Sequence, residues 1–331
     1  MKVGKAEEKV YKRSIEIYLP TANERLAKKP STGRDASAIK SDFFGGGNIL
    51  SASSTFIGKG EQTAKWALAG AVNNILASGG EPIGVSLMIT MPKKLREIKL
   101  KGIMSAFGEE CEKLNLAIIG GHTQVSEAVN EPVISVNAIG REIYSQKEIK
   151  PGMDIVMSGY AGAAGTAIIA AQHESKLKER FPEKFVESAM TLEKYKYVKA
   201  AVAVAGKSDA YPMHDGGQGG IFGALWEMAT GSCVGLEIEM RKILFRQETI
   251  EISEFFDINP YELFSQGVIL FACENGVALK DELLAAGIEA EVIGRTTASN
   301  DRVIINGEER RFLEPAKSDQ LFVLEGTTNS D

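Results

Sequence analysis

The sequence predicts an α/β (α+β) protein of two domains, on three observations. The chain has 331 residues, more than one ordinary hydrophobic core accommodates. Apolar stretches of strand length alternate with segments of helical apolar spacing along its length. The turn residues Lys150, Pro151 and Gly152 separate two halves. We therefore expect domains over 1–149 and 150–320, with a flexible tail over 321–331.

In the first half, an amphipathic helix over 5–19 and a loop are expected to precede two strands joined through Gly45–Gly47. This glycine run lies between strands and lacks the Gly-Lys-Ser/Thr ending of a phosphate loop, so it indicates a hairpin turn. Helical spacing follows, and the apolar runs between the helices have strand length. The expected helices are 61–78 and 93–115, and the expected strands include 80–92, 116–121 and 132–143.

The second half repeats the alternation, with glycine-rich turns between strands and helices. We expect strands over 154–159, 234–240 and 268–273, helices over 164–179, 192–206 and 220–230, and a last helix and strand within 278–298.

Composition and charge limit the function. The net charge of −6 argues against a nucleic-acid or anionic-membrane surface. The N-terminal residues are charged throughout, and no run of about 20 apolar residues exists, so we expect a soluble cytoplasmic protein. Cys111, Cys233 and Cys273 are scattered, which supports neither a zinc site nor a disulfide framework.

Two glycine-rich turns are candidate binding elements. Gly159 and Gly162 lie between a strand and a helix, where free N–H groups can hold an anion or simply form a tight turn. His214 and Asp215 precede a second glycine-rich turn and a helix. Asp215 is either a helix cap or a substrate or metal ligand. The Asn73-Asn74 pair, in a helix of small residues, indicates a polar partner for one of its side chains.

These pieces, in this order, resemble the aminoimidazole ribonucleotide synthetase (PurM-like) superfamily, and most of all its HypE-like hydrogenase maturation group. "AVNNILASGGEPIGVSL" is similar to the group's helix containing Asn-Asp, and "IIGGHT" to its Gly-Gly-Asp-Thr. "MHDGGQGGIFGALWEMA" and "FFDINPYELFSQGVILFAC" are similar to two later segments, so the likeness spans about residues 30–315.

The resemblance implies a two-domain fold in which the N-terminal domain pairs with its twin in a shared β-barrel. It also implies an ATP site at the dimer interface and transfer of the γ-phosphoryl group to a small substrate, with Mg²⁺ held by aspartates. Four of those aspartate positions are changed here, to Arg34, Ser54, Asn74 and His122, while Asp35 is retained. Magnesium prefers hard oxygen ligands, so we expect weak binding of Mg²⁺, through Asp35 and Asn74.

The resemblance also assigns roles to residues. It implies a nucleotide site at Asp35, Ser54, Asn74, Gly120, Gly121 and Thr123, catalytic roles for His122 and Asp215, and substrate contacts at Gly159, Gly162, His214, Gly219 and Gly220.

Several functions stay open at this stage. One is an ATP-dependent phosphoryl-transfer enzyme, including a kinase of a vitamin precursor. Another is a non-catalytic dimeric scaffold with a maturation partner protein. The carbamoyl reaction is not carried over, because the group's C-terminal cysteine has no counterpart in "LFVLEGTTNSD".

Overall fold

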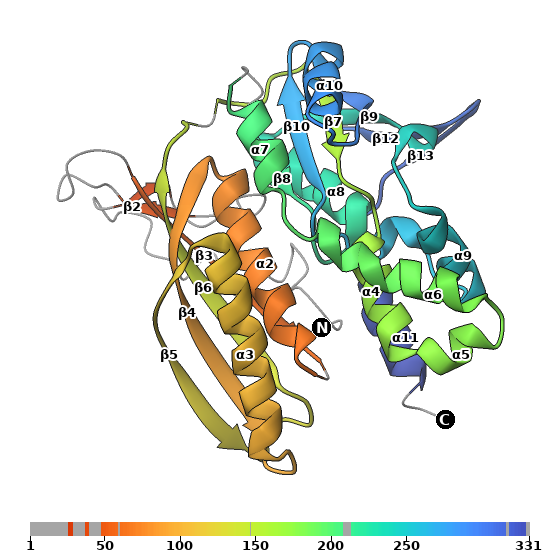
Figure 1. Ribbon diagram of the computed structural model, residues 1–331. Helices are drawn as coiled ribbons and strands as arrows, with labels where there is room; N and C mark the ends of the chain where they lie inside the picture. Colours follow the sequence, from red (N-terminus) through yellow and green to blue (C-terminus); the bar gives the residue numbers. More distant parts are fainter. Residues whose placement is uncertain are drawn as a thin grey trace. The chain divides into compact units, whose positions relative to one another are not determined.

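The structure, a computed structural model, describes residues 26–28, 37–39, 48–58, 60–145, 147–207, 213–315 and 318–328. The chain divides into two compact units, with the change from one to the other near residue 145 (Figure 1). Each unit combines a mixed sheet with helices, so the predicted α/β class is confirmed. Residues 5–19, Arg34, Asp35 and the Gly45–Gly47 hairpin lie outside the described residues.

The N-terminal unit is a six-stranded sheet with two long helices. Strand order is β1-β2-β3-β6-β4-β5, and only the β4–β5 pair is parallel. The parallel pair needs a crossover, which α3 supplies. The elements are β1 (Leu26–Lys28), β2 (Ser37–Ile39), β3 (Ile49–Ile57), α2 (Gln62–Ala77), β4 (Gly80–Pro92), α3 (Glu97–Leu114), β5 (Ala117–Ser126) and β6 (Val133–Glu142).

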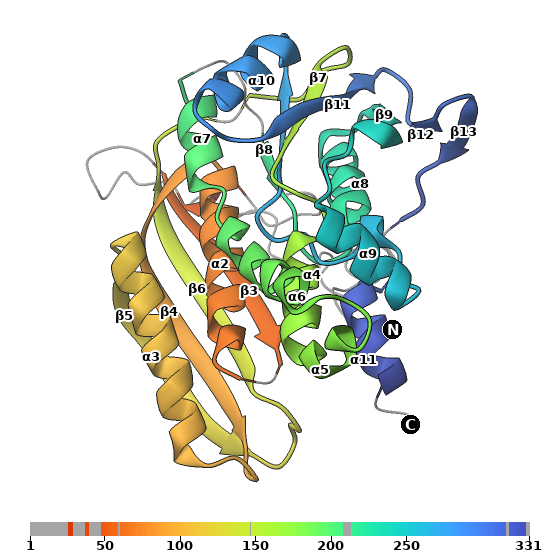
Figure 2. The same ribbon diagram turned by 45° about the vertical axis from the view of Figure 1, so that its right-hand side comes forward.

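Helices α2 and α3 cover one face of this sheet (Figures 1 and 2). Strand alternation places Leu50, Val85 and Val136 beneath them, and these side chains are fully buried. No described helix of this unit covers the opposite face, which we call the open face. It presents Ser51, Ser53, Thr55, Ser86, Met88, Thr90, His122, Gln124, Ser135 and Asn137.

The C-terminal unit contains a seven-stranded sheet in the order β13-β12-β9-β11-β7-β10-β8. Only the β12–β9 pair is parallel. The strands are β7 (Asp154–Ser158), β8 (Met213–Asp215), β9 (Gly235–Glu239), β10 (Ile269–Cys273), β11 (Ala290–Thr297), β12 (Arg302–Asn306) and β13 (Glu309–Phe312).

Apolar strands explain why this sheet is buried on both faces at its centre. Ile155 and Leu270 pack into one core with residues of α8, and the alternate residues Val156 and Phe271 are also fully buried. The helices are α4 (Ala163–Gln172), α5 (Glu174–Lys178), α6 (Glu183–Met190), η2 (Thr191–Tyr195), α7 (Lys199–Ala205), α8 (Gly220–Ser232), η3 (Met240–Lys242), α9 (Gln247–Phe255), η4 (Pro260–Glu262), α10 (Gly276–Ala285) and α11 (Gln320–Thr328).

The expectation of a flexible tail from residue 321 is wrong for residues 321–328. They belong to helix α11, whose Leu321 and Leu324 side chains are buried. Burial of these two leucines offsets the conformational entropy of ordering the segment. Residues 329–331 lie outside the described part of the chain.

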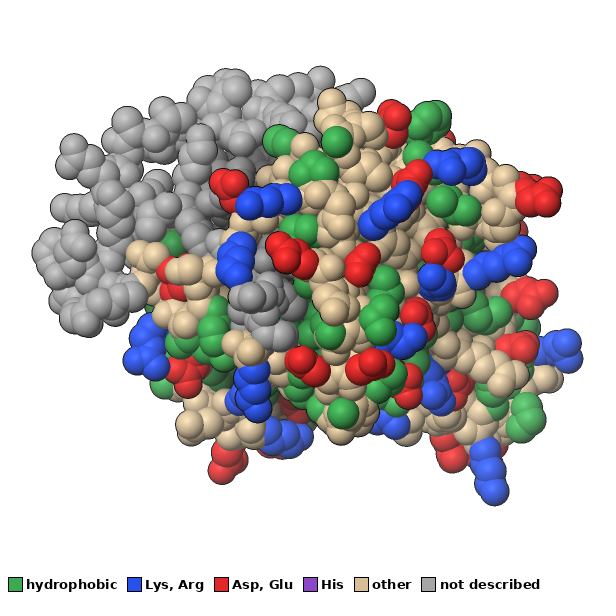
Figure 3. Space-filling view, turned by 90° about the horizontal axis from the view of Figure 1, so that it is seen from above, with side chains coloured by type: hydrophobic (Ala, Val, Ile, Leu, Met, Phe, Trp, Pro, Cys, Tyr) green, Lys and Arg blue, Asp and Glu red, His purple; other side chains and the backbone are tan. Residues whose placement is uncertain are grey.

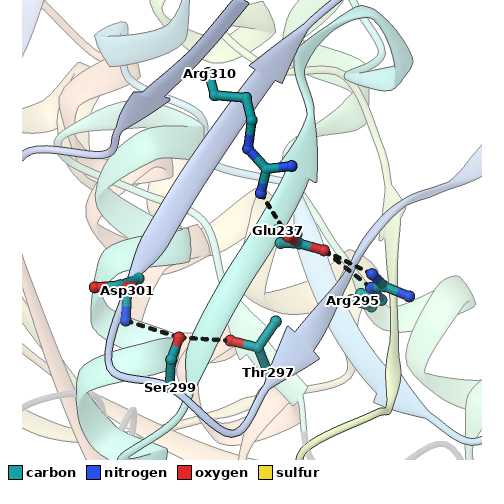
Figure 4. Close-up of polar contacts among 6 residues, drawn as sticks. All are labelled: Glu237, Arg295, Thr297, Ser299, Asp301 and Arg310. Atoms are coloured by element: carbon teal, nitrogen blue, oxygen red, sulfur yellow. Dashed lines mark hydrogen bonds and ion pairs between the residues drawn. The ribbon is translucent and has the colours of Figure 1, made fainter.

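The surface carries charges of both signs. On the face drawn in Figure 3, basic and acidic side chains of the described residues are interspersed. One such group joins three strands of the C-terminal sheet, because Glu237 on β9 accepts hydrogen bonds from Arg295 on β11 and Arg310 on β13 (Figure 4). Among the described helices, none has the length and apolar character needed to cross a bilayer.

Candidate functional site

Two candidate residues of the N-terminal unit lie on opposite faces of its sheet. Ser54 on β3 pairs with Val136, on the face covered by helices. His122 on β5 pairs with Met88, on the open face. Strands β6 and β4 also lie between β3 and β5. Within one chain, Ser54 and His122 therefore do not form a common site.

The Gly120–Thr123 segment is part of a strand. The prediction ended this strand at residue 121, but β5 continues to Ser126 at the exposed edge of the sheet. Gly121 has a φ of 157°, and a Cβ at this position would lie 2.1 Å from the carbonyl oxygen of Leu87. Close packing against β4 thus accounts for Gly121 without a nucleotide. His122 and Thr123 are both exposed.

Apart from Met88, which pairs with His122, the open face consists of polar side chains. Met88 separates His122 from Ser135, whose hydroxyl lies 2.8 Å from the Thr55 hydroxyl. Next along the sheet, the Asn137 amide donates to Ser53 Oγ at 2.9 Å. This surface is richer in hydroxyl and amide groups than the apolar strand sequences suggested.

The Asn73-Asn74 pair lies in the last turns of α2. Asn73 is fully buried, and Asn74 is partly exposed. In the described part of the chain, no three His, Cys, Asp or Glu side chains are placed to hold a metal ion. The described residues therefore do not fit a carboxylate site for Mg²⁺, and Asp35 lies outside them.

In the C-terminal unit, by contrast, the candidate residues converge. Ser158 ends β7 and Asp215 ends β8, and both pair with Ile269 at the start of β10. The two glycine-rich turns therefore leave the sheet at the same end of its strands, on either side of β10. The segment Leu263–Val268 leads into β10 between them. We call these two turns and this segment the turn cluster.

Hydrogen bonds tie the turn cluster together. The Gly162 N–H donates to Ser265 Oγ at 2.8 Å, and the Gly159 N–H donates to the Glu289 carbonyl at 3.3 Å. In the second turn, the Gly219 N–H donates to a carboxylate oxygen of Asp319 at 2.7 Å. The N–H groups of Gly159 and Gly162, which sequence analysis offered to an anion, are thus bound to protein oxygens, and so is the N–H group of Gly219.

Gly220 is required by both space and conformation. Its φ is 66°, in the left-handed region, and an added Cβ would lie 2.4 Å from the Tyr261 carbonyl oxygen. Helix α8 can therefore begin here only with glycine. The close approach brings the first turn of α8 against η4, which explains part of the glycine pattern structurally.

His214 and Asp215 are both buried on β8. His214 Nε2 lies 3.4 Å from Glu227 Oε2 on α8. Asp215 Oδ2 accepts a hydrogen bond from Gln266 Nε2 at 3.3 Å. Asp215 is therefore directed toward the turn cluster, and its partner is a side chain of the segment that enters β10.

Sequence analysis missed Ser265, Gln266 and Asp319. Ser265 and Gln266 lie in "FSQG", inside a segment that carries the resemblance, but sequence analysis assigned no role to either residue. Asp319 had a local signal, because "SDQLFVL" places an Asp before an apolar run, as at a helix N-terminus. Burial raises the pKa of Asp319 to about 7, although three backbone N–H groups oppose this rise.

A further missed group flanks the first turn. The Arg246 guanidinium lies 5.4 Å from the centre of the Tyr160 ring, and Arg246 Nε lies 3.5 Å from Glu248 Oε2. Ser188 Oγ donates to the other oxygen of Glu248 at 2.6 Å. Burial raises the pKa of Tyr160, so its hydroxyl stays protonated at neutral pH.

Comparison with known families covers both units. The family model of the AIR synthase related protein, N-terminal domain, matches residues 31–141, and that of the C-terminal domain matches residues 150–306. A Methanocaldococcus jannaschii protein named for hydrogenase expression/formation is 25% identical, over 82% of this chain and 77% of its own. The carbamoyl dehydratase HypE of Rhizobium leguminosarum bv. viciae is 24% identical, over 86% and 79%.

Solved structures share the fold at low sequence identity. HypE of E. coli has a TM-score of 0.72 and 17% identity, over 92% of this chain and 96% of its own. A HypE structure in complex with ATP has a TM-score of 0.69 and 17% identity, over 86% and 89%. A HypE–HypF complex contains a chain with a TM-score of 0.68 and 22% identity, over 85% and 93%. The two-domain PurM-like fold implied by the resemblance is confirmed.

Proposed function

Because the chain belongs to the AIR synthase related protein family, we propose that it is a HypE-like protein of hydrogenase formation that binds ATP. One observation carries this proposal: the similarity to HypE proteins covers both units, and a HypE with the same fold was solved with ATP. The nucleotide side is assigned to the N-terminal unit, with Asn74, Gly120, Gly121 and Thr123. The location we propose is the cytoplasm.

The substrate side is assigned to the turn cluster of the C-terminal unit. Asp215 supplies a buried carboxylate held by Gln266, and the glycines allow close approach of a ligand to the backbone. A carboxylate in this position can accept a proton from a substrate hydroxyl or amide as the phosphoryl group is transferred. The substrate side is proposed to be lined by Gly159, Gly162, His214, Gly219 and Gly220.

A second candidate is a scaffold that binds nucleotide without chemistry. It is supported by the placement of Ser54 and His122 on opposite faces and by the absence of a metal-binding group among the described residues. Burial raises the pKa of the Cys111 and Cys273 thiols to about 11. Neither is therefore a thiolate that could carry an acyl group at neutral pH.

Calorimetric titration with ATP, with and without Mg²⁺, tests the proposal. Because the described residues hold no set of carboxylates for Mg²⁺, we expect the ATP affinity to change by less than about tenfold when EDTA removes the metal. Changes at a tightly held metal site typically alter the affinity by about 10–100-fold. A measurement of phosphate or ADP release then distinguishes the proposed enzyme from the proposed scaffold, because only the enzyme would hydrolyse or transfer the γ-phosphoryl group. Failure to bind ATP at millimolar concentration, with or without Mg²⁺, would overturn the ATP-binding proposal.

We also propose that the protein is a homodimer through the N-terminal unit. The open face and edge strand β5 leave Met88, Ile118, Ile119 and Val125 exposed. A second copy would cover these side chains and pair the free edge. A maturation partner protein is a further part of the proposal, supported by the HypE–HypF complex among the structures that share this fold.

A further inference from the structure

Two tyrosines and two basic residues lie together beside the first glycine turn. The rings of Tyr160 and Tyr195 meet edge to face, with their centres 5.1 Å apart. The Arg246 guanidinium lies 5.4 Å from the centre of the Tyr160 ring, and Lys194 Nζ lies 4.9 Å from that of the Tyr195 ring. We call these four residues the tyrosine row. Each ring of the pair therefore contacts a cation.

Backbone contacts hold the tyrosine row against the turn cluster. The Ala161 N–H donates to the Leu244 carbonyl oxygen at 2.9 Å, which joins the first glycine turn to the segment before α9. An added Cβ at Gly267, whose φ is 98°, would lie 2.0 Å from the Tyr195 carbonyl oxygen. Glycine therefore lets the end of η2 pack directly on the segment that enters β10. These two contacts place all parts of the row beside the candidate substrate side.

Arg246 is paired with a carboxylate that leaves part of its guanidinium for another partner. Glu248 is buried, and its Oε2 lies 3.5 Å from Arg246 Nε, while its Oε1 accepts a hydrogen bond from Ser188. Among the described residues, Glu248 is the one carboxylate within ion-pair distance of Arg246. The terminal nitrogens Nη1 and Nη2 are thus not paired with a carboxylate, and 39% of the side chain is exposed. Such a fork can bind two oxygens of a phosphate or a carboxylate.

Other groups of the tyrosine row also favour an anion. In the part of the chain that the structure describes, Lys194 is exposed and has no ion pair. Burial raises the pKa of Tyr160, and its interaction with the Arg246 guanidinium opposes this rise, so the hydroxyl remains a hydrogen-bond donor at neutral pH. The carboxylate of Glu289 is the opposing charge near Tyr160. Glu289 is exposed, so solvent and salt screen it.

We propose that the tyrosine row binds an oxyanion group, a phosphate or a carboxylate, of the substrate held at the turn cluster. The Arg246 fork and the Tyr160 hydroxyl contact its oxygens, and Lys194 adds positive charge. The substrate is thus a small anionic molecule. This inference rests on the proposed function, because it names the substrate class of the site assigned to the turn cluster.

Ligand-observed NMR of the full-length protein, without ATP and at low ionic strength, tests the subsite. Phenyl phosphate and benzoate are the anionic probes, and benzamide is the neutral isostere of benzoate. We expect at least one anion to bind about tenfold more tightly than benzamide, since hydrogen bonds to a charged group are the stronger ones. Tighter binding of phenyl phosphate than of benzoate indicates a phosphate substrate, and the reverse order indicates a carboxylate.

Variants locate the bound anion. Arg246→Gln should weaken binding of the tighter anion about tenfold, and Arg246→Lys, which keeps the charge without the fork, should restore only part of it. Tyr160→Phe and Lys194→Gln should each weaken it about two- to threefold. Lys176→Gln is the matched control and should leave the affinity unchanged. Lys176 is also exposed and lies 5.1 Å from the centre of the Phe256 ring, at the opposite end of α9 from Arg246.

The outcomes separate this inference from the proposed function. Equal affinity for all three probes, no binding of either anion at millimolar concentration, or the same loss in Lys176→Gln as in Lys194→Gln would overturn the anion subsite. If Arg246→Gln does not fold, unchanged affinity in both Tyr160→Phe and Lys194→Gln would also overturn it. Loss of anion binding with intact ATP binding contradicts the subsite alone, whereas anion binding without ATP binding contradicts the proposed function alone.

Discussion

The two units place their candidate residues in opposite ways. In the C-terminal unit, Asp215 and the glycine turns meet at the same end of the sheet. There Asp215 accepts a hydrogen bond from Gln266, and Gly162 and Gly219 donate to Ser265 and Asp319, respectively. In the N-terminal unit, Ser54 and His122 lie on opposite faces with two strands between them. The first cluster is assembled by a single chain. The second is dispersed, and a second copy of the chain would have to contribute to enclose it.

Packing explains the contrast. Much of the turn cluster is buried, and one chain supplies the hydrogen-bond partners of Gly159, Gly162, Gly219 and Ser265. Strand β5 lies at the edge of its sheet and is exposed along nearly its whole length. The burial and the contacts of its residues therefore depend on what covers the open face. Substitutions in the C-terminal unit should therefore change folding stability, and substitutions on the open face should change association.

The largest effect is expected for Gly220→Ala. The new side chain meets the Tyr261 carbonyl at 2.4 Å in a left-handed backbone conformation, and these two costs together amount to about 2–5 kcal/mol. Urea unfolding monitored through Trp226, in a background with Trp66→Phe, reports on α8 alone. The transition should shift strongly to lower urea concentration.

Gly287→Ala is the matched control for the conformational part of this cost. Gly287 has a φ of 75°, and nothing lies within 4 Å of an added Cβ. We expect a loss of about 1–2 kcal/mol from conformation alone. Equal losses at both positions would show that the close contact of Gly220 with η4 contributes nothing to the turn cluster.

Much of the fold could be predicted from the sequence, because local patterns determine it. The apolar spacing over 61–78 matches α2, and the run 268–273 matches β10 within a residue. Ile103, Phe107 and Cys111, four residues apart, form the buried side of α3, as amphipathic spacing requires. The prediction of a flexible tail failed for residues 321–328 because it followed the polar "EGTTNSD" and did not weigh the apolar residues of "DQLFVL".

The site could be predicted only in part, for a different physical reason. The glycine turns have a local signature, and the resemblance assigned their place in the chain. Ser265 and Asp319 act on residues 103 and 100 positions away, respectively, and no local pattern reports contacts at that distance. The extension of β5 through His122 was also missed, since its strand length depends on pairing with β4.

Met88→Lys tests the other side of the comparison. Met88 is 44% exposed on the open face, and a lysine there would bury a charge in the proposed dimer interface. We expect the dissociation constant of the dimer to rise on the order of 100-fold, which light scattering over a concentration series would detect. Ile98→Lys is the control, because Ile98 is 64% exposed on α3, in the helical layer. Association that is unchanged in Met88→Lys would contradict an interface on the open face.

Ser265→Ala should have a smaller effect, confined to the C-terminal unit. It leaves the Gly162 N–H and the Leu263 carbonyl without the Ser265 hydroxyl, at a cost of about 1–3 kcal/mol. Ser253→Ala is a matched control, since Ser253 is equally buried and its hydroxyl has no hydrogen-bond partner in the described structure. Thermal unfolding should show a loss for the first variant and none for the second.

The smallest effect is expected for Glu237→Gln. This variant tests whether the exposed face of the same unit contributes as much to folding stability as the buried turn cluster does. Hydrogen bonds from Arg295 and Arg310 hold the pKa of Glu237 below its usual range. The contribution of the ionised form is therefore present at neutral pH and is lost as the pH falls through that lowered pKa. Salt screens such surface pairs, so the melting temperature should fall by no more than about 1–2 °C at low ionic strength and by nothing measurable in 0.5 M NaCl. Glu309→Gln, at an exposed residue of β13 for which the described structure shows no ion pair, should be neutral in both conditions. A loss in Glu237→Gln that survives high salt and equals that of Ser265→Ala would show that the exposed network supports the C-terminal unit as strongly as its buried turns.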